Sequence, residues 1–161
     1  MEFRQVIKRT HRIAALVGYS VFGALVLYLV LVELIRRTMA PFYGLYPVSS
    51  IQAITKIRYL GYGLSAISVI LARVLQSWLL RRKAGSKAQD LLNRLHRTSL
   101  IVLIMSELPA LFGLIMFLIH GLYRDFYILL VVSIIVLFIF FPRRQAWEDW
   151  ILSQTETEGS R

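Results

Sequence analysis

Long apolar runs alternate with short clusters of basic residues along this chain. A helix needs roughly 20 apolar residues to cross the hydrocarbon of a bilayer. No run shows the strict alternation of apolar and polar residues that a barrel strand would show. Backbone groups in lipid must be hydrogen-bonded within the protein, so helices are the remaining solution. The pattern therefore predicts an all-α polytopic membrane protein with four transmembrane helices, at residues 13–35, 57–80, 98–120 and 126–142.

Composition excludes most soluble proteins. The 161 residues are 57% hydrophobic and 17% charged, with a mean hydropathy of +0.63. A soluble domain is about 45–50% apolar and about 25% charged. A disordered chain would be far more polar. The chain has no cysteine, which excludes a disulfide framework, a thiol nucleophile and a thiolate metal site. We expect residues 1–161 to form a single four-helix transmembrane domain.

The basic residues between the spans predict the orientation. Cytoplasmic flanks carry an excess of Lys and Arg, and here the two sides carry 12 and 5. The 12 are Arg4, Lys8, Arg9, Arg12, Arg81, Arg82, Lys83, Lys87, Arg94, Arg97, Arg143 and Arg144, and the 5 are Arg36, Arg37, Lys56, Arg58 and Arg124. Both termini are therefore predicted inside the cell. The net charge of +10 then indicates contact with anionic lipid headgroups. It does not call for a nucleic-acid partner, and we expect the inner (plasma) membrane of a prokaryote.

Local patterns predict further features around the spans. Ser49 or Ser50 is placed to cap the helix of the second span. Apolar residues on one helical face within 83–97 predict that the third helix extends beyond the membrane. Residues 145–153 have Trp147, Trp150 and Ile151 at a spacing typical of an interfacial helix.

Small residues distinguish helices that pack against protein from helices that face lipid. The second span has Gly61, Ser65, Ser68 and Ala72 at positions i, i+4, i+7 and i+11. Such a stripe lets two helices approach closely in a membrane. The fourth span has almost only Leu, Ile, Val and Phe, and Ser133 is its exception. We therefore expect the fourth helix to be the one that faces lipid most.

Glu107 is the strongest functional candidate. It lies nine residues into the third span, about 14 Å deep at 1.5 Å per residue. Ionisable side chains near the bilayer centre cost about 3 kcal/mol or more and usually have a function. Pro109 lacks an N–H and clashes with the carbonyl of Met105, which predicts a helix kink beside the carboxyl group. Ser106 begins a small-residue stripe that continues through Ala110, so we expect Glu107 to face protein.

Arg73 is the other ionisable residue deep within a span. Its position leaves three alternatives for the role of Glu107. It lies about 10 Å from the inner end of the second span. Consecutive spans are antiparallel, so Arg73 can form an ion pair with Glu107. Otherwise, Glu107 is a proton or cation site, or a neutral buried acid without a transport role. Ser106 and Gln76 are expected to complete the ion-binding site or the charge pair.

The remaining ionisable residues have simpler interpretations. Glu33 is followed by Arg36 and Arg37 at i+3 and i+4, which predicts an ion pair at the headgroup level. His11, His96 and His120 lie at span ends, where they do not predict a haem or metal site. The chain has no nucleophile elbow, glycine-rich phosphate loop or metalloprotease motif. We expect no enzymatic activity and no cofactor.

The residues around Glu107 resemble a known family. The segment 106–115, SELPALFGLI, is similar to the carboxylate helix of rotary ATP synthase c-subunit proteolipids, in which a Glu precedes an Ala, an aromatic residue and a Gly-Leu pair. The likeness extends over residues 57–120 as a hairpin with a basic loop. It departs from the family because the repeated GxGxG pattern is absent, Arg73 has no counterpart, and two further spans flank the hairpin. The resemblance implies that Glu107 is an ion-binding carboxylate.

Two functions follow from these observations. The first is a small non-enzymatic membrane protein that handles protons or cations through Glu107. The alternative is an accessory or assembly subunit of a larger membrane complex, held together by an Arg73–Glu107 pair. Either function fits a homo-oligomer or a partner within a membrane complex.

Overall fold

The described part of the chain forms four helices, as the apolar pattern predicts. The computed structural model describes residues 2–46, 50–79 and 88–141, with side chains described from residue 12 in the first helix and residue 96 in the third. The helices are α1 (Glu2–Thr38), α2 (Ile51–Leu79), α3 (Ala88–His120) and α4 (Tyr123–Phe140). Each is long and apolar enough to cross a membrane. The expected interfacial helix at 145–153 lies outside the described residues.

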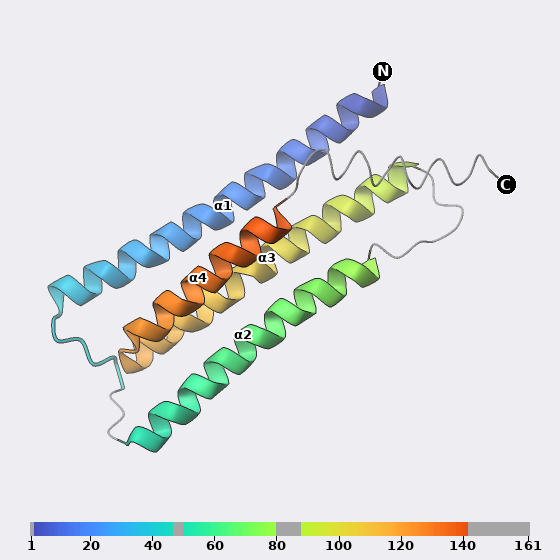
Figure 1. Ribbon diagram of the computed structural model, residues 1–161. Coiled ribbons are helices and arrows are strands. Elements are labelled where there is room, and N and C mark those ends of the chain that lie inside the picture. The colour runs from blue at the N-terminus through green and yellow to red at the C-terminus, as the bar shows by residue number, and fades with distance from the viewer. Residues whose placement is uncertain (1, 47–49, 80–87, 142–161) are drawn as a thin grey trace.

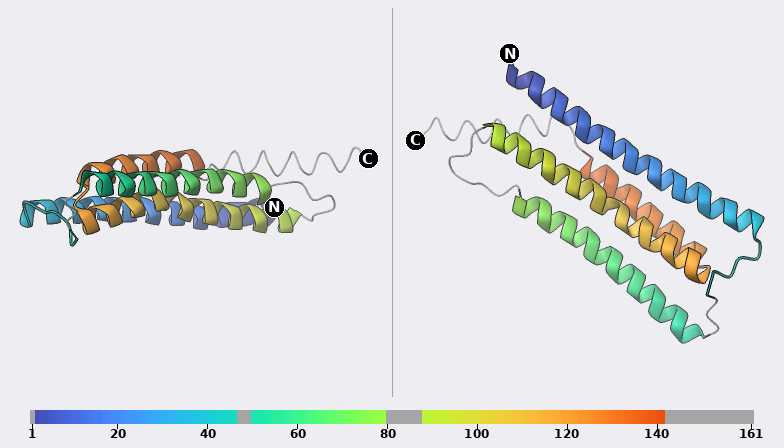
Figure 2. Two further views of the ribbon diagram at one scale, coloured as in Figure 1. Left: turned by 90° about the horizontal axis from the view of Figure 1, so that it is seen from below. Right: turned by 180° about the vertical axis from the view of Figure 1, so that it is seen from behind.

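The helix α3 is the centre of the molecule. It contacts α1, α2 and α4, whereas α1 and α2 have no contact with each other among the described residues. Figure 1 shows α4 lying along α3, with α1 on one side of this pair and α2 on the other. Seen from behind, α3 lies between α1 and α2, and none of the described helices covers its near face (Figure 2, right). The four helices therefore form an open arrangement rather than a closed bundle.

The fourth helix is not the most exposed one, which corrects the expectation from its composition. The share of residues buried within each apolar span is 22% for α1, 22% for α2, 50% for α3 and 39% for α4. Close packing needs small residues on only one of two partner helices, and α3 supplies them. A Cβ added at Gly113 would lie 3.0 Å from Phe126 Cα and 3.1 Å from Leu129 Cβ. The lack of small residues in α4 therefore does not show whether this helix faces lipid or protein.

Ser133, the polar exception in α4, has a structural role beside Pro109. The helix α3 runs through the proline as one helix. Proline disturbs the hydrogen-bond ladder around it. The N–H of Ala110, the next residue, donates to Ser133 Oγ at 2.8 Å. The fourth helix therefore supplies an acceptor where the sequence of α3 disrupts its own ladder.

The small-residue stripe of α2 is the buried side of this helix, which confirms that it is a packing surface. Gly61, Ser65, Ser68 and Ala72 are the buried residues of this helix. A Cβ added at Gly61 would overlap the sulfur of Met116, so the two helices are in close contact there. This contact fixes which side of α2 meets the centre of the molecule.

The connections at one end are tied to the helices by backbone hydrogen bonds. The N–H groups of Leu45 and Tyr46 donate to the carbonyls of Leu118 and Ile119, at 3.0 and 2.8 Å. Gly44 has φ +86°, and a Cβ there would lie within 2.7 Å of the α3 terminus, so glycine is required. The N–H of Ala53 donates to Ser50 Oγ at 3.2 Å, which confirms the predicted cap. At the opposite end, α3 begins at Ala88, ten residues before the predicted span, so the helix is longer than the span as expected.

Candidate functional site

Glu107 is paired with a tyrosine of the first helix. The hydroxyl of Tyr28 donates a hydrogen bond to Glu107 Oε1, and both side chains are half-buried. Tyr28 lies on the α1 face whose buried residues include Leu25 and Val32, and this face packs against α3. Sequence reasoning missed Tyr28. Its position in the middle of the first span, on the same face as these apolar residues, was the available signal.

The predicted Arg73–Glu107 pair is not formed within this chain. Arg73 is exposed, and its Nη1 donates to Gln76 Oε1 at 3.2 Å. The reason is geometric, because α1 and α2 lie on opposite sides of α3 and Glu107 points toward α1. In addition, Ala72 is buried against α3, and the next residue of a helix is rotated by about 100°. Arg73 therefore projects away from the centre.

The other two predicted site residues do not join Glu107. Ser106 is fully buried, and its hydroxyl donates to the carbonyl of Leu103 in the same helix at 2.6 Å. Gln76 contacts Arg73 on α2. The structure therefore separates the predicted site into two parts, a carboxyl group between α1 and α3 and an arginine on the far side of α2.

Asp125 is a buried carboxylate, the most deeply buried one among the described side chains, and sequence reasoning missed it. Its side chain lies in the first turn of α4 and is 5% exposed. Arg58 Nε is 3.0 Å from Asp125 Oδ2, and the hydroxyl of Tyr62 donates to Oδ1 at 2.7 Å. These contacts join α2 to α4. The available signal was an acidic residue at the start of the fourth span and a basic residue at the start of the second.

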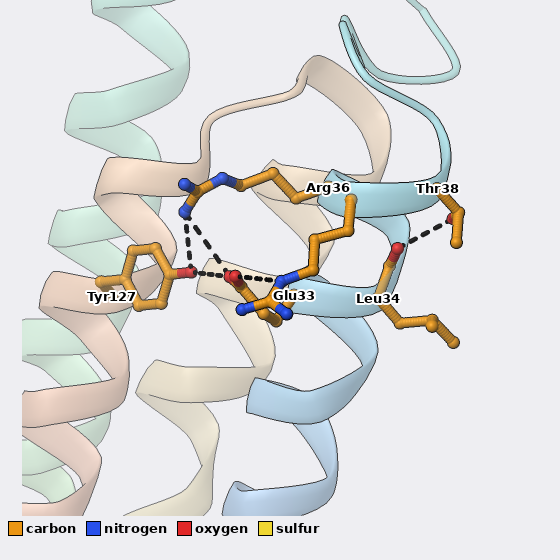
Figure 3. Close-up of polar contacts among 6 residues, drawn as sticks. Glu33, Leu34, Arg36, Thr38 and Tyr127 are labelled. Atoms are coloured by element: carbon orange, nitrogen blue, oxygen red, sulfur yellow. Dashed lines mark hydrogen bonds and ion pairs between the residues drawn. The ribbon is translucent and has the colours of Figure 1, made fainter.

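Glu33 forms the ion pairs that its spacing predicts, and it also contacts α4. Arg37 Nε is 3.0 Å from Oε1, and Arg36 Nη1 is 3.5 Å from Oε2. The hydroxyl of Tyr127 donates to Glu33 Oε2 at 2.9 Å (Figure 3). Arg36 also donates to the Tyr127 oxygen at 3.3 Å. The cluster therefore links the end of α1 to the beginning of α4.

The three carboxylates with described side chains thus differ in their partners. Glu33 and Asp125 each have an arginine and a tyrosine. Glu107 has the tyrosine alone, and no ion pair to it occurs among the described side chains. A carboxylate with a phenol as its only partner keeps its charge uncompensated when it is ionised. This difference distinguishes Glu107 chemically from the other two.

The histidines do not form a metal centre in the described part of the chain. His120 Nδ1 lies 3.0 Å from the carbonyl oxygen of Tyr46. The side chain of His11 lies outside the described residues. Among the described residues, no group of three His, Cys, Asp or Glu side chains is placed to hold a metal ion.

The chain matches no protein-family model, no curated protein and no solved structure. The resemblance of residues 57–120 to the c-subunit proteolipids therefore stays a prediction from the residues around Glu107.

Proposed function

We propose that this chain is an integral membrane protein that takes up and releases protons through Glu107. Four apolar helices support the membrane location. Large apolar side chains on the surface support it as well, among them Leu27 at 64% and Val30 at 60% exposure. Such a surface is unfavourable in water and compatible with lipid. The basic residues favour an inner membrane with both termini inside.

The observation that carries the proposal is the neutral partner of Glu107. An ionised carboxylate in a medium of low dielectric is costly unless a cation compensates it. Binding a proton removes this cost, and losing the proton restores it. The hydroxyl of Tyr28 donates to a carboxyl oxygen in either state. The site can therefore exist with and without the proton while Tyr28 keeps its contact.

The contacts of Glu107 favour a proton over a metal cation. Calcium takes six to eight oxygen ligands, and magnesium demands an octahedral set. The described partners of Glu107 amount to the single oxygen of Tyr28. The resemblance of segment 106–115 to an ion-carrying helix adds support for proton or cation handling at this residue. The accessory-subunit alternative loses its main support, since the Arg73–Glu107 pair is not formed within the chain.

The test is proton flux into liposomes that contain the purified protein. A potassium gradient with valinomycin sets the driving force, and an internal pH-sensitive dye reports the flux. We expect E107Q to lower the flux to that of empty liposomes, because an amide does not exchange a proton at this pH. The matched control is E33Q, which replaces a carboxylate with two arginine partners and should retain the flux. Equal flux for E107Q and the unchanged chain would reject the proposal.

A further inference from the structure

Arg73 is an exposed charge on α2, one helical turn before the polar residues Gln76 and Ser77. It lies six residues before the end of the helix. Its neighbours Ile70 and Val74 are 61% and 56% exposed, so this surface is suited to lipid. Its hydrogen bond among the described residues goes to Gln76. Charged residues within membrane spans almost always face other protein or a water-filled cavity, and they pair. A partner protein on this side of α2 would supply the counter-charge that Arg73 lacks among the described side chains.

Glu107 lies at nearly the same depth as Arg73. The contact between Gly61 and Met116 aligns the antiparallel helices α2 and α3. Twelve residues beyond Gly61 is Arg73, and twelve residues before Met116 is Ile104, so these two positions are level. Glu107 is three residues further along α3, or about 4.5 Å along the helix axis. An arginine side chain is long enough to bridge this difference.

Glu107 also borders a part of α3 that its own chain leaves open. None of the described helices covers the face of α3 that lies between α1 and α2 (Figure 2, right). Ile104, one helical turn before Glu107, is 58% exposed, and Ile115 is 44% exposed. A second molecule can therefore approach Glu107 from this face. Arg73 and Glu107 are on different sides of the protomer, so one chain cannot join them and two neighbouring chains can.

We propose that copies of this chain associate side by side in the membrane, with Glu107 of one copy paired with Arg73 of the partner subunit. The two charges are opposite, lack an ion-pair partner among the described side chains and lie at one depth when both copies have the same orientation. This inference goes beyond the proposed function, because a paired Arg73 compensates the charge of Glu107; proton uptake then belongs to copies whose Glu107 has no such neighbour, and pairing is the state in which the site holds no proton. The occupant of the open α3 face is thus a second copy of this chain.

Charge reversal in two separate chains tests the pairing. Because the chain has no cysteine, one engineered cysteine per copy allows donor and acceptor dyes for energy transfer in liposomes. R73E copies alone should associate about tenfold more weakly or worse, since like charges then meet at the contact. E107R copies alone should behave the same way. An equimolar mixture of R73E and E107R should associate again, because every contact between unlike copies then joins opposite charges.

Control variants keep the outcome decisive. R124E reverses an exposed arginine at the start of α4 and should associate like the unchanged chain. If circular dichroism shows that a reversal variant does not fold, R73Q replaces it. This variant alters only an exposed side chain and should also weaken association about tenfold. The proposal is overturned if the unchanged chain stays monomeric, if R73E or R73Q associates normally, or if the mixture does not recover. None of these results depends on proton flux, so the proposed function is judged separately.

Discussion

Two carboxyl groups of this molecule make the same contact with a tyrosine and differ in one further partner. Asp125 accepts a hydrogen bond from Tyr62 and is held by Arg58, while its side chain is almost completely buried. Glu107 accepts a hydrogen bond from Tyr28, is half-buried and has no ion pair among the described side chains. The arginine is therefore the difference between the two sites. It places a positive charge beside the carboxylate of Asp125, and no described side chain does the same for Glu107.

Under the proposed function, this difference is what distinguishes the structural role expected of Asp125 from the proton-carrying role proposed for Glu107. Asp125 is buried while Arg58 is partly exposed. Removing the arginine leaves the buried carboxylate uncompensated, so the Asp125 cluster is expected to hold α2 against α4. Glu107 contributes a single hydrogen bond between α1 and α3, which is worth much less. If burial alone were the criterion, Asp125 would be the stronger functional candidate, since it is the more deeply buried carboxylate.

The largest expected effect is on stability and comes from removing Arg58. R58M leaves Asp125 buried without a cation, and we expect it to lower the free energy of unfolding by about 3 kcal/mol. R73M is the matched control, because Arg73 is exposed and its described partner is Gln76; it should change the stability of the monomer by less than about 0.5 kcal/mol. Denaturation in detergent, followed by circular dichroism, measures both. Equal losses would remove the structural distinction between the two arginines.

The second prediction converts the Glu107 site into one like that of Asp125. In Y28R a guanidinium group replaces the phenol, and we expect it to hold Glu107 ionised. Carbodiimides react with protonated carboxyl groups, so labelling of Glu107 should fall about tenfold or more, which corresponds to about 1.4 kcal/mol. Y28F is the control, because it removes the hydroxyl without adding charge and should leave Glu107 reactive. Unchanged labelling in Y28R would show that a cation at this position does not govern the site.

A third prediction compares the two tyrosines. Y62F removes a hydrogen bond to a buried charged group and should cost about 1.5–3 kcal/mol of stability. Y28F removes the corresponding bond from a half-buried carboxyl group and should cost about 1 kcal/mol or less. Thermal unfolding in the same detergent gives the ranking. A larger loss for Y28F than for Y62F would contradict the assignment of the Asp125 cluster as the structural one.

The smallest expected effect is that of E107Q on stability. The amide oxygen of glutamine can accept the hydrogen bond from the Tyr28 hydroxyl in place of the carboxyl oxygen, so the contact between α1 and α3 is kept. We expect the monomer to lose less than about 0.5 kcal/mol, within the range of a neutral substitution. The same unfolding measurement checks this. A loss comparable with that of R58M would mean that Glu107 is a structural residue and that a loss of flux reflects damage to the fold.

Local spacing in the sequence was sufficient to predict the helices and the contacts within them. The four apolar runs predicted four helices, the stripe from Gly61 to Ala72 predicted the packed face of α2, and Glu33 formed the ion pairs that i+3 and i+4 spacing predicts. Ser50 caps α2 for the same reason, since a cap depends on residues three positions apart. These features need no knowledge of how distant parts of the chain are arranged.

Contacts between helices could not be predicted in the same way. Consecutive spans suggested that Arg73 would reach Glu107, but the side of α3 on which each helix packs is set by the whole arrangement. Tyr28 is 79 residues from Glu107, and Arg58 is 67 residues from Asp125. The uniform composition of α4 was also misleading, because Gly113 on the facing helix supplies the space for the contact. Each of these wrong or missing predictions depends on how a helix is rotated about its axis or on which helix it packs against. The sequence of one helix does not determine either.

The most direct test of the central claim is the site of carbodiimide labelling in the unchanged chain. The protein is reconstituted in liposomes, dilute enough to keep copies apart, and treated with dicyclohexylcarbodiimide; mass spectrometry of the peptides then locates the modified residue. We predict modification at Glu107, none at Asp125 or Glu33, and loss of all modification in E107Q. Modification of Asp125 at the rate of Glu107, or an unmodified Glu107, would contradict the claim that the missing arginine leaves Glu107 able to carry a proton.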